Sequence, residues 1–70
     1  MKHIKHTIGK RIAEERNNLG LSQEELADLV GYHRTYIGTV ERGEINATIQ
    51  RIYKIALALK MPLEKLFKDF

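Results

Sequence analysis

Seventy residues, with 43% hydrophobic and 30% charged side chains, make one small globular domain, residues 1–70, with little stability to spare. There is no cysteine, no run near the ~20 apolar residues of a membrane span, and no apolar segment after the opening MKHIKH. We therefore expect a cytoplasmic protein that has no contact with a membrane. The net charge of +3 suits a polyanionic partner without demonstrating one.

Three glycines divide the first two thirds of the chain into short segments with helical patterns. Gly20, Gly31 and Gly43 each follow such a segment, where a left-handed C-terminal cap is needed. The first helix is expected from about Thr7 to Leu19, with Ile4, Ile8 and Ile12 as its apolar stripe. Residues 1–6 are expected to form a flexible basic arm.

The later segments carry their own start signals. Ser22, followed three residues later by Glu25, is the capping-box pattern. Thr48 can cap a further helix, and Pro62 can end that helix and start a short last one. Apolar residues recur at helical spacing as Leu26, Ala27 and Val30, then Ile49, Ile52, Ile55, Ala56 and Leu59, and finally Leu63, Leu66, Phe67 and Phe70.

The segment RTYIGTVERG, residues 34–43, favours neither helix nor strand by propensity, because it combines β-branched residues with an interior glycine. On a helical wheel its faces nevertheless separate. One arc of about 140°, here called the outer arc, holds Arg34, Thr35, Gly38, Thr39 and Arg42. Such small and basic residues predict a surface for the close approach of a partner at Gly38; the alternative is a tolerated glycine in a loosely specified helix.

A capped helix, a short turn over residues 31–33 and the helix with the outer arc make a helix-turn-helix, whose second helix enters the major groove of DNA. The stretches GLSQEELADLVG, RTYIGTVERG and IYKIALALKMPLEKLF resemble the Cro, phage-repressor and XRE-type helix-turn-helix family over nearly the whole chain. RTYI before ERGE looks most like the controller proteins of restriction-modification genes. The resemblance implies an all-α, compact five-helix fold of the lambda-repressor type and a transcriptional regulator, not an enzyme, without a cofactor.

The resemblance also implies roles for individual residues. Base edges would be read by Arg34, Thr35 and Thr39, which the wheel independently places on the outer arc. Arg34 can donate twice to guanine, with a phosphate contact as the alternative. Backbone contacts are expected from Ser22, Gln23, Tyr36, Arg42 and Asn46, each with a capping, packing or solvent-exposed role as the alternative. Lys2 and Lys5 in the arm either contact DNA or face solvent.

Two further expectations concern structure and assembly. Glu41 falls on the inward arc, where an unpaired carboxylate is costly, and the resemblance implies a salt bridge to Arg16. The last helix has more apolar surface than one small core needs, so we expect Leu63 and Phe70 to form a two-fold interface of a homodimer. The alternative is that all the apolar side chains of this helix close the core of a monomer.

The expected partners are double-stranded DNA, as a palindromic operator, and a second copy of the chain, with RNA polymerase as a further candidate. No small-molecule ligand is expected, because the chain has no room for a sensing module. His3 and His6 have the spacing of helical metal ligands, but no cysteine or nearby carboxylate completes a site, so no metal is expected.

The family usually has other residues at His33, Gly38, Ile45, Ala47 and Pro62, which puts in question the cap of the recognition helix and part of the grip on DNA after Gly43. The rival reading is a protein-interaction module, such as an antitoxin-like or polymerase-contacting adaptor. That class predicts an apolar outer arc, whereas the outer arc of this chain is polar and basic.

Overall fold

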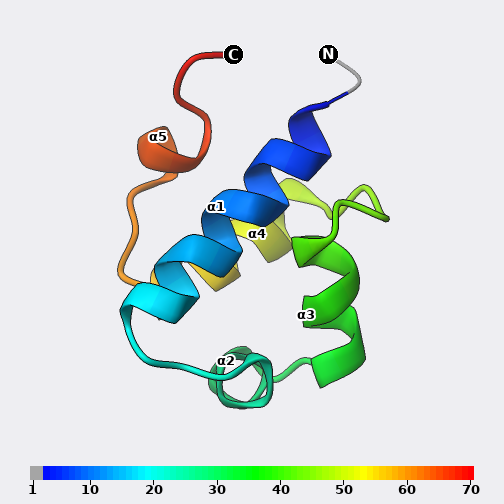
Figure 1. Ribbon diagram of the computed structural model, residues 1–70, viewed down its shortest axis with the longest axis vertical. Helices are drawn as coiled ribbons and strands as arrows, with labels where there is room; N and C mark the ends of the chain where they lie inside the picture. The colour runs from blue at the N-terminus through cyan, green and yellow to red at the C-terminus, as the bar shows by residue number, and fades with distance from the viewer. Residues whose placement is uncertain (1–2) are drawn as a thin grey trace.

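The computed structural model describes residues 3–70, and the chain folds into five helices. These are α1 Ile4–Asn18, α2 Gln23–Val30, α3 Arg34–Glu41, α4 Ile49–Ala58 and α5 Leu63–Leu66. In Figure 1, α1 crosses in front of α4, while α3 and α5 lie on opposite sides of α1. The predicted all-α, five-helix fold is confirmed. None of the helices in the part of the chain described here is long and apolar enough to cross a membrane.

The start signals act as predicted at α2 and α4. The Ser22 hydroxyl accepts the N–H of Glu25 at 3.0 Å, and the Glu25 carboxylate accepts the N–H of Ser22 at 2.8 Å, which completes the capping box. The hydrogen bond from the Ser22 backbone also holds the pKa of Glu25 below its usual value. Thr48 caps α4 by accepting the N–H of Arg51 at 3.2 Å.

The prediction for the start of α1 is wrong by three residues. The helix begins at Ile4 rather than Thr7, and the N–H of Thr7 already donates to the carbonyl of His3 at 3.0 Å. The expected arm is therefore helical from Ile4 onward, because Ile4 packs against the core and draws the first turn into the domain. Met1 and Lys2 lie outside the described residues.

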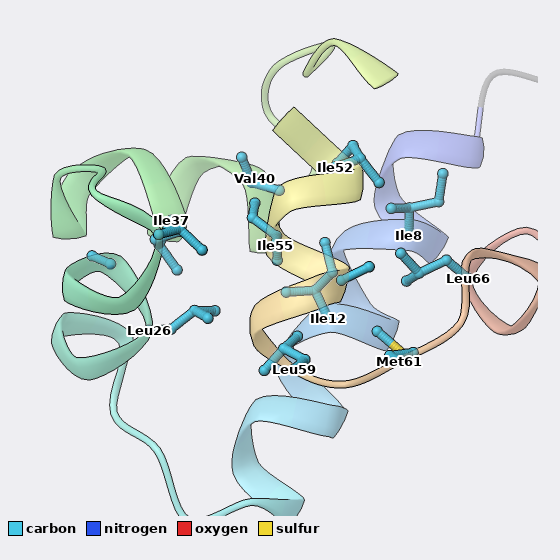
Figure 2. Close-up of a cluster of buried hydrophobic side chains, with 13 residues drawn as sticks. Ile8, Ile12, Leu26, Ile37, Val40, Ile52, Ile55, Leu59, Met61 and Leu66 are labelled. Atoms are coloured by element: carbon cyan, nitrogen blue, oxygen red, sulfur yellow. The ribbon is translucent and has the colours of Figure 1, made fainter. Parts of the chain in front are cut away.

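The buried apolar side chains form one core, most of which is visible in Figure 2. Its members are Ile8, Ile12, Leu26, Ala27, Val30, Ile37, Val40, Ile52, Ile55, Ala56, Leu59, Met61 and Leu66. Most of the apolar positions that recur at helical spacing thus lie in this core or pack against it, whereas Ile49 and Phe70 are exposed. Ile49, which the spacing assigned to the core, is 61% exposed, because it lies on a second apolar stripe of α4 described below.

The α1 and α3 helices meet backbone to backbone at a glycine that the sequence analysis did not single out. A β-carbon on Gly9 would lie 2.6 Å from the carbonyl oxygen of Glu41 and against that of Val40. Just past α3, Gly43 has a φ of +70°, and a β-carbon on it would lie 2.7 Å from the Cα of His6. Only glycine fits either position, so this pair of contacts fixes how the end of α3 rests on α1.

Candidate nucleic-acid interface

The turn between α2 and α3 follows the predicted geometry. Gly31 ends α2 with a φ of +78°, and its N–H donates to the carbonyl of Ala27 at 2.8 Å. His33 is the N-cap residue of α3 but makes no side-chain cap hydrogen bond. The sequence had indicated that a histidine here is a poor cap for the recognition helix, and the structure agrees. The α3 helix therefore depends on tertiary contacts and not on a capping side chain.

The three expected base-reading residues lie on the side of α3 away from the core. Arg34 and Thr35 are exposed, whereas Thr39 is half-buried. The Thr39 hydroxyl donates to the carbonyl of Tyr36 at 2.7 Å, so its proton is used within the helix. Thr39 can therefore present its methyl group or an oxygen lone pair to a base, but not a hydroxyl donor in this conformation.

The predicted salt bridge between Arg16 and Glu41 is confirmed. Two hydrogen bonds join them, from Nε to Oε2 at 2.7 Å and from Nη2 to Oε1 at 3.0 Å. The Arg16 side chain is 11% exposed and that of Glu41 is 5% exposed. The hydrogen bond to Glu41 raises the pKa of Arg16 above its usual value. This pair ties α3 to α1.

The start of α2 joins the same network. Gln23 is half-buried, and its side-chain amide donates to Oε1 of Glu41 at 2.9 Å. Its amide group is thus held by α3 instead of being free to reach a phosphate. Ser22 is exposed but its hydroxyl is engaged in the capping box, so the structure gives it the capping role.

Arg42 is paired with a residue that the sequence analysis did not consider. Its Nε and Nη2 donate to the two carboxylate oxygens of Glu44 at 2.9 and 3.1 Å, and both side chains are more than half exposed. Hydrogen bonding from Arg42 lowers the pKa of Glu44. An arginine that is already paired has a weaker pull on phosphate than the sequence alone indicated.

The backbone of α3 at Gly38 is covered by a side chain in this structure, and the close approach of a partner there stays a prediction. Gly38 is buried, because the Arg42 side chain folds over it and Gln23 lies beside it. A β-carbon on Gly38 would lie 3.0 Å from Nη1 of Arg42 and 3.7 Å from Oε1 of Gln23. The group that approaches closely is thus an arginine of the same chain.

The Tyr36 hydroxyl lies inside the domain in this structure, and its contact with a phosphate stays a prediction. The hydroxyl is buried and has no hydrogen-bond partner, because the ring packs inward. The rings of Tyr36 and Tyr32 meet edge-on, with their centroids 5.3 Å apart. The guanidinium of Arg51 lies 5.3 Å from the centroid of the Tyr36 ring. Asn46 is exposed in the segment between α3 and α4, as a backbone contact requires.

The expected interface residues of the last helix differ in exposure. Leu63 is half-buried against the core, whereas Phe70 is 52% exposed, with the guanidinium of Arg11 5.2 Å from its ring centroid. Arg11 also donates to the carbonyls of Leu66 and Lys68, each at 2.8 Å, and so holds the C-terminal segment.

A more continuous apolar surface lies on α4. Ile49, Tyr53 and Leu57, here called the α4 stripe, are 61%, 49% and 58% exposed. Their four-residue spacing puts them on one side of the helix, and that spacing could have revealed them from the sequence. In the described part of the chain, no three His, Asp or Glu side chains gather into a group that could hold a metal ion.

Comparison with known proteins places these features in context. A helix-turn-helix family model matches residues 12–66. The chain is 44% identical over 63 residues to control protein C.SmaI of Serratia marcescens, covering 90% of this chain and 75% of that protein. It is 33% identical over 70 residues to control protein C.MunI of a Mycoplasma species, covering 99% and 95%. The crystal structure of the restriction-modification controller protein C.AhdI from Aeromonas hydrophila matches with a TM-score of 0.84 and 45% identity, over 89% of this chain and 94% of that one.

Proposed function

Because the chain belongs to the helix-turn-helix family of DNA-binding transcriptional regulators, we propose that it controls restriction-modification genes as a homodimer on a palindromic operator. The observation that carries the proposal is the polar, basic outer arc of α3 on a chain similar to three controller proteins. The proposal includes action in the cytoplasm and a contact with RNA polymerase at the promoter. Regulation then depends on protein concentration, dimerisation and the arrangement of operators.

In this proposal α3 lies in the major groove and reads the bases. Arg34, exposed at the first position of α3, donates its planar fork to guanine O6 and N7, and Thr35 and Thr39 contact neighbouring bases. The start of α2 approaches the phosphate backbone through its free N–H groups, with Gln23 held against Glu41 so that α2 and α3 dock as one unit.

We place most of the two-fold interface on the α4 stripe instead of on Leu63 and Phe70 alone. The stripe adjoins an apolar groove of about 540 Å³, lined in part by Ile49, Ile52 and Phe67, which continues the apolar surface toward α5. Burying this surface against a second copy would favour association, and the two-fold axis would place two recognition helices ~34 Å apart, about one turn of DNA.

Sedimentation tests the assembly. Leu57→Glu should convert the dimer into a monomer at micromolar concentration, because it puts a charge on the apolar surface that the dimer would bury. Leu29→Glu is the matched control, since Leu29 is 61% exposed on α2 and lies outside the α4 stripe. Phe70→Glu tests the interface expected at the C-terminus. If the protein remains a dimer with Leu57→Glu but becomes a monomer with Phe70→Glu, the interface lies at the C-terminal end of the chain and not on the α4 stripe.

Selection of DNA from a random pool tests recognition. The wild-type protein should select a palindrome, and Arg34→Ala should lose its preference at one base pair per half-site, by about 1–3 kcal/mol. Gln23→Ala should weaken binding to all sequences by similar factors, because it loosens the docking of α2 on α3, and the phosphate contacts of α2 carry no sequence information. If no sequence is selected while a protein partner binds α3, the chain is an interaction module and the proposal fails.

A further inference from the structure

The Arg42–Glu44 pair leaves one edge of the guanidinium free. Nε and Nη2 are the two nitrogens bound to Glu44, at 2.9 and 3.1 Å. Because an arginine has five N–H donors in a fixed fork, the edge formed by Nη1 and the second N–H of Nη2 remains available. That edge can donate two parallel hydrogen bonds to one acceptor group, the geometry that guanine O6 and N7 require.

The position of this free edge follows from Gly38. Side chains on a helix lean toward its N-terminus, so Arg42 reaches back over the residue four positions earlier. Since that residue is glycine, Nη1 can lie 3.0 Å from the point that a β-carbon would occupy. The guanidinium therefore rests on the outer arc near the middle of α3 and does not extend beyond its C-terminal end.

Glu44 is itself held in place by the end of α3. Its N–H donates to the carbonyl of Thr39 at 3.0 Å, and Gly43 before it has the left-handed φ of +70° that this turn requires. The turn thus fixes the backbone from which the Glu44 carboxylate reaches Arg42. The carboxylate both orients the plane of the guanidinium and offsets its charge, which favours a directional contact over a phosphate contact.

We propose that Arg42 is a second guanine-reading arginine of α3, that Glu44 positions it and that Gly38 makes room for it. The inference rests on the proposed docking of α3 in the major groove. The Arg42 guanidinium lies one helical turn, about 6 Å along the axis, from the level of Arg34. The second guanine should therefore lie in the same half-site, toward the C-terminal end of α3 from the guanine that Arg34 reads.

Selection from a random DNA pool, followed by titration on single-base variants, tests the proposal. Arg42→Lys keeps the charge but removes the planar fork, so it should reduce the preference for this second guanine by ~5-fold or more. Glu44→Gln should reduce the preference at the same base pair while strengthening binding to unrelated sequences, because one negative charge is lost. Gly38→Ala, which displaces Nη1, should also weaken the preference there.

Glu15→Gln is the matched control for charge. Glu15 pairs with Lys65 at 3.2 Å, so its replacement changes the net charge by the same amount at a pair between α1 and α5. It should strengthen non-specific binding without altering any base preference. Thermal unfolding should show all four variants folded.

Unchanged base preferences in Arg42→Lys would overturn the reading role, and equal strengthening at all sequences by Glu44→Gln would identify a phosphate contact. If Arg42→Lys loses the guanine but Glu44→Gln keeps it, the positioning role of Glu44 is wrong. Arg34→Ala separates these failures from failure of the proposed function: if it still loses its own base pair, α3 reads DNA and only the inference about Arg42 has failed.

Discussion

Replacing Glu41 should be among the most damaging single changes in this domain. The carboxylate is 5% exposed and accepts hydrogen bonds from Arg16 and Gln23. Glu41→Leu keeps most of the volume but leaves the buried guanidinium without its partner. Breaking one side of a buried ion pair costs about 3–5 kcal/mol.

The structure places the expected loss at the lower end of that range. Arg16 also donates to the carbonyl of Leu21 at 2.7 Å and to Oδ1 of Asn17 at 3.2 Å, so two acceptors remain after Glu41 is replaced. We expect about 3 kcal/mol, out of a total of roughly 4–10 kcal/mol for a domain of this size. The melting temperature should fall by more than about 10 °C.

A double-mutant cycle with Glu41→Leu and Arg16→Met, measured by denaturant unfolding at neutral pH, isolates the pair. The free energy of unfolding of the double variant should exceed the value expected from adding the two single losses by at least ~2 kcal/mol. The reason is that two apolar side chains replace two charges, so no buried charge is left without a partner. The same cycle on the exposed Arg42–Glu44 pair should give a much smaller coupling that disappears at high salt. Additivity of the Arg16 and Glu41 losses would refute the reasoning.

Two further predictions concern stability. Gly9→Ala should destabilise the domain by ~1–3 kcal/mol in spite of its better helix propensity, because the new β-carbon meets carbonyls of α3 that cannot rotate away. Gly38→Ala, which meets only the end of a flexible arginine, should stabilise by up to ~1 kcal/mol, and thermal unfolding of the two variants compares them. The pKa of Glu25 is lowered in the folded state, so its stabilising effect should be complete above about pH 4.3 and be lost as the pH falls through the folded-state pKa. Glu25→Gln should lack this part of the pH dependence, and parallel curves for the two proteins would contradict the assignment.

Local signals allowed much of the fold to be predicted from the sequence. The capping box at Ser22, the Thr48 cap and the left-handed Gly31 each depend on a few neighbouring residues, so their geometry follows from residue type and spacing. The inward direction of Ile37 and Val40 followed from the helical wheel even though the segment has poor helix propensity.

The structure departs from what the sequence indicated where long side chains or distant segments decide the outcome. A wheel gives the direction in which Tyr36 or Arg42 leaves the helix axis, but not whether the side chain folds inward or back along the helix. The ring of Tyr36 turned inward, and Arg42 filled the space above Gly38. Gly9 offered one signal that could have been used, since an interior glycine in a helix often marks a close approach of two backbones.

These contacts also explain how a helix of such weak intrinsic propensity could serve the recognition role proposed for it. The α3 helix lacks a side-chain cap and contains an interior glycine, so its own propensity contributes little. It is held instead by Glu41, which accepts hydrogen bonds from both α1 and α2, and by the contact of its last carbonyls with Gly9. Because the same carboxylate fixes Gln23 at the start of α2, the residues that we propose to hold DNA and those that we propose to read it keep one relative orientation. A change at Glu41 that leaves the domain folded should therefore weaken operator binding even though Glu41 is almost completely buried and points away from the outer arc.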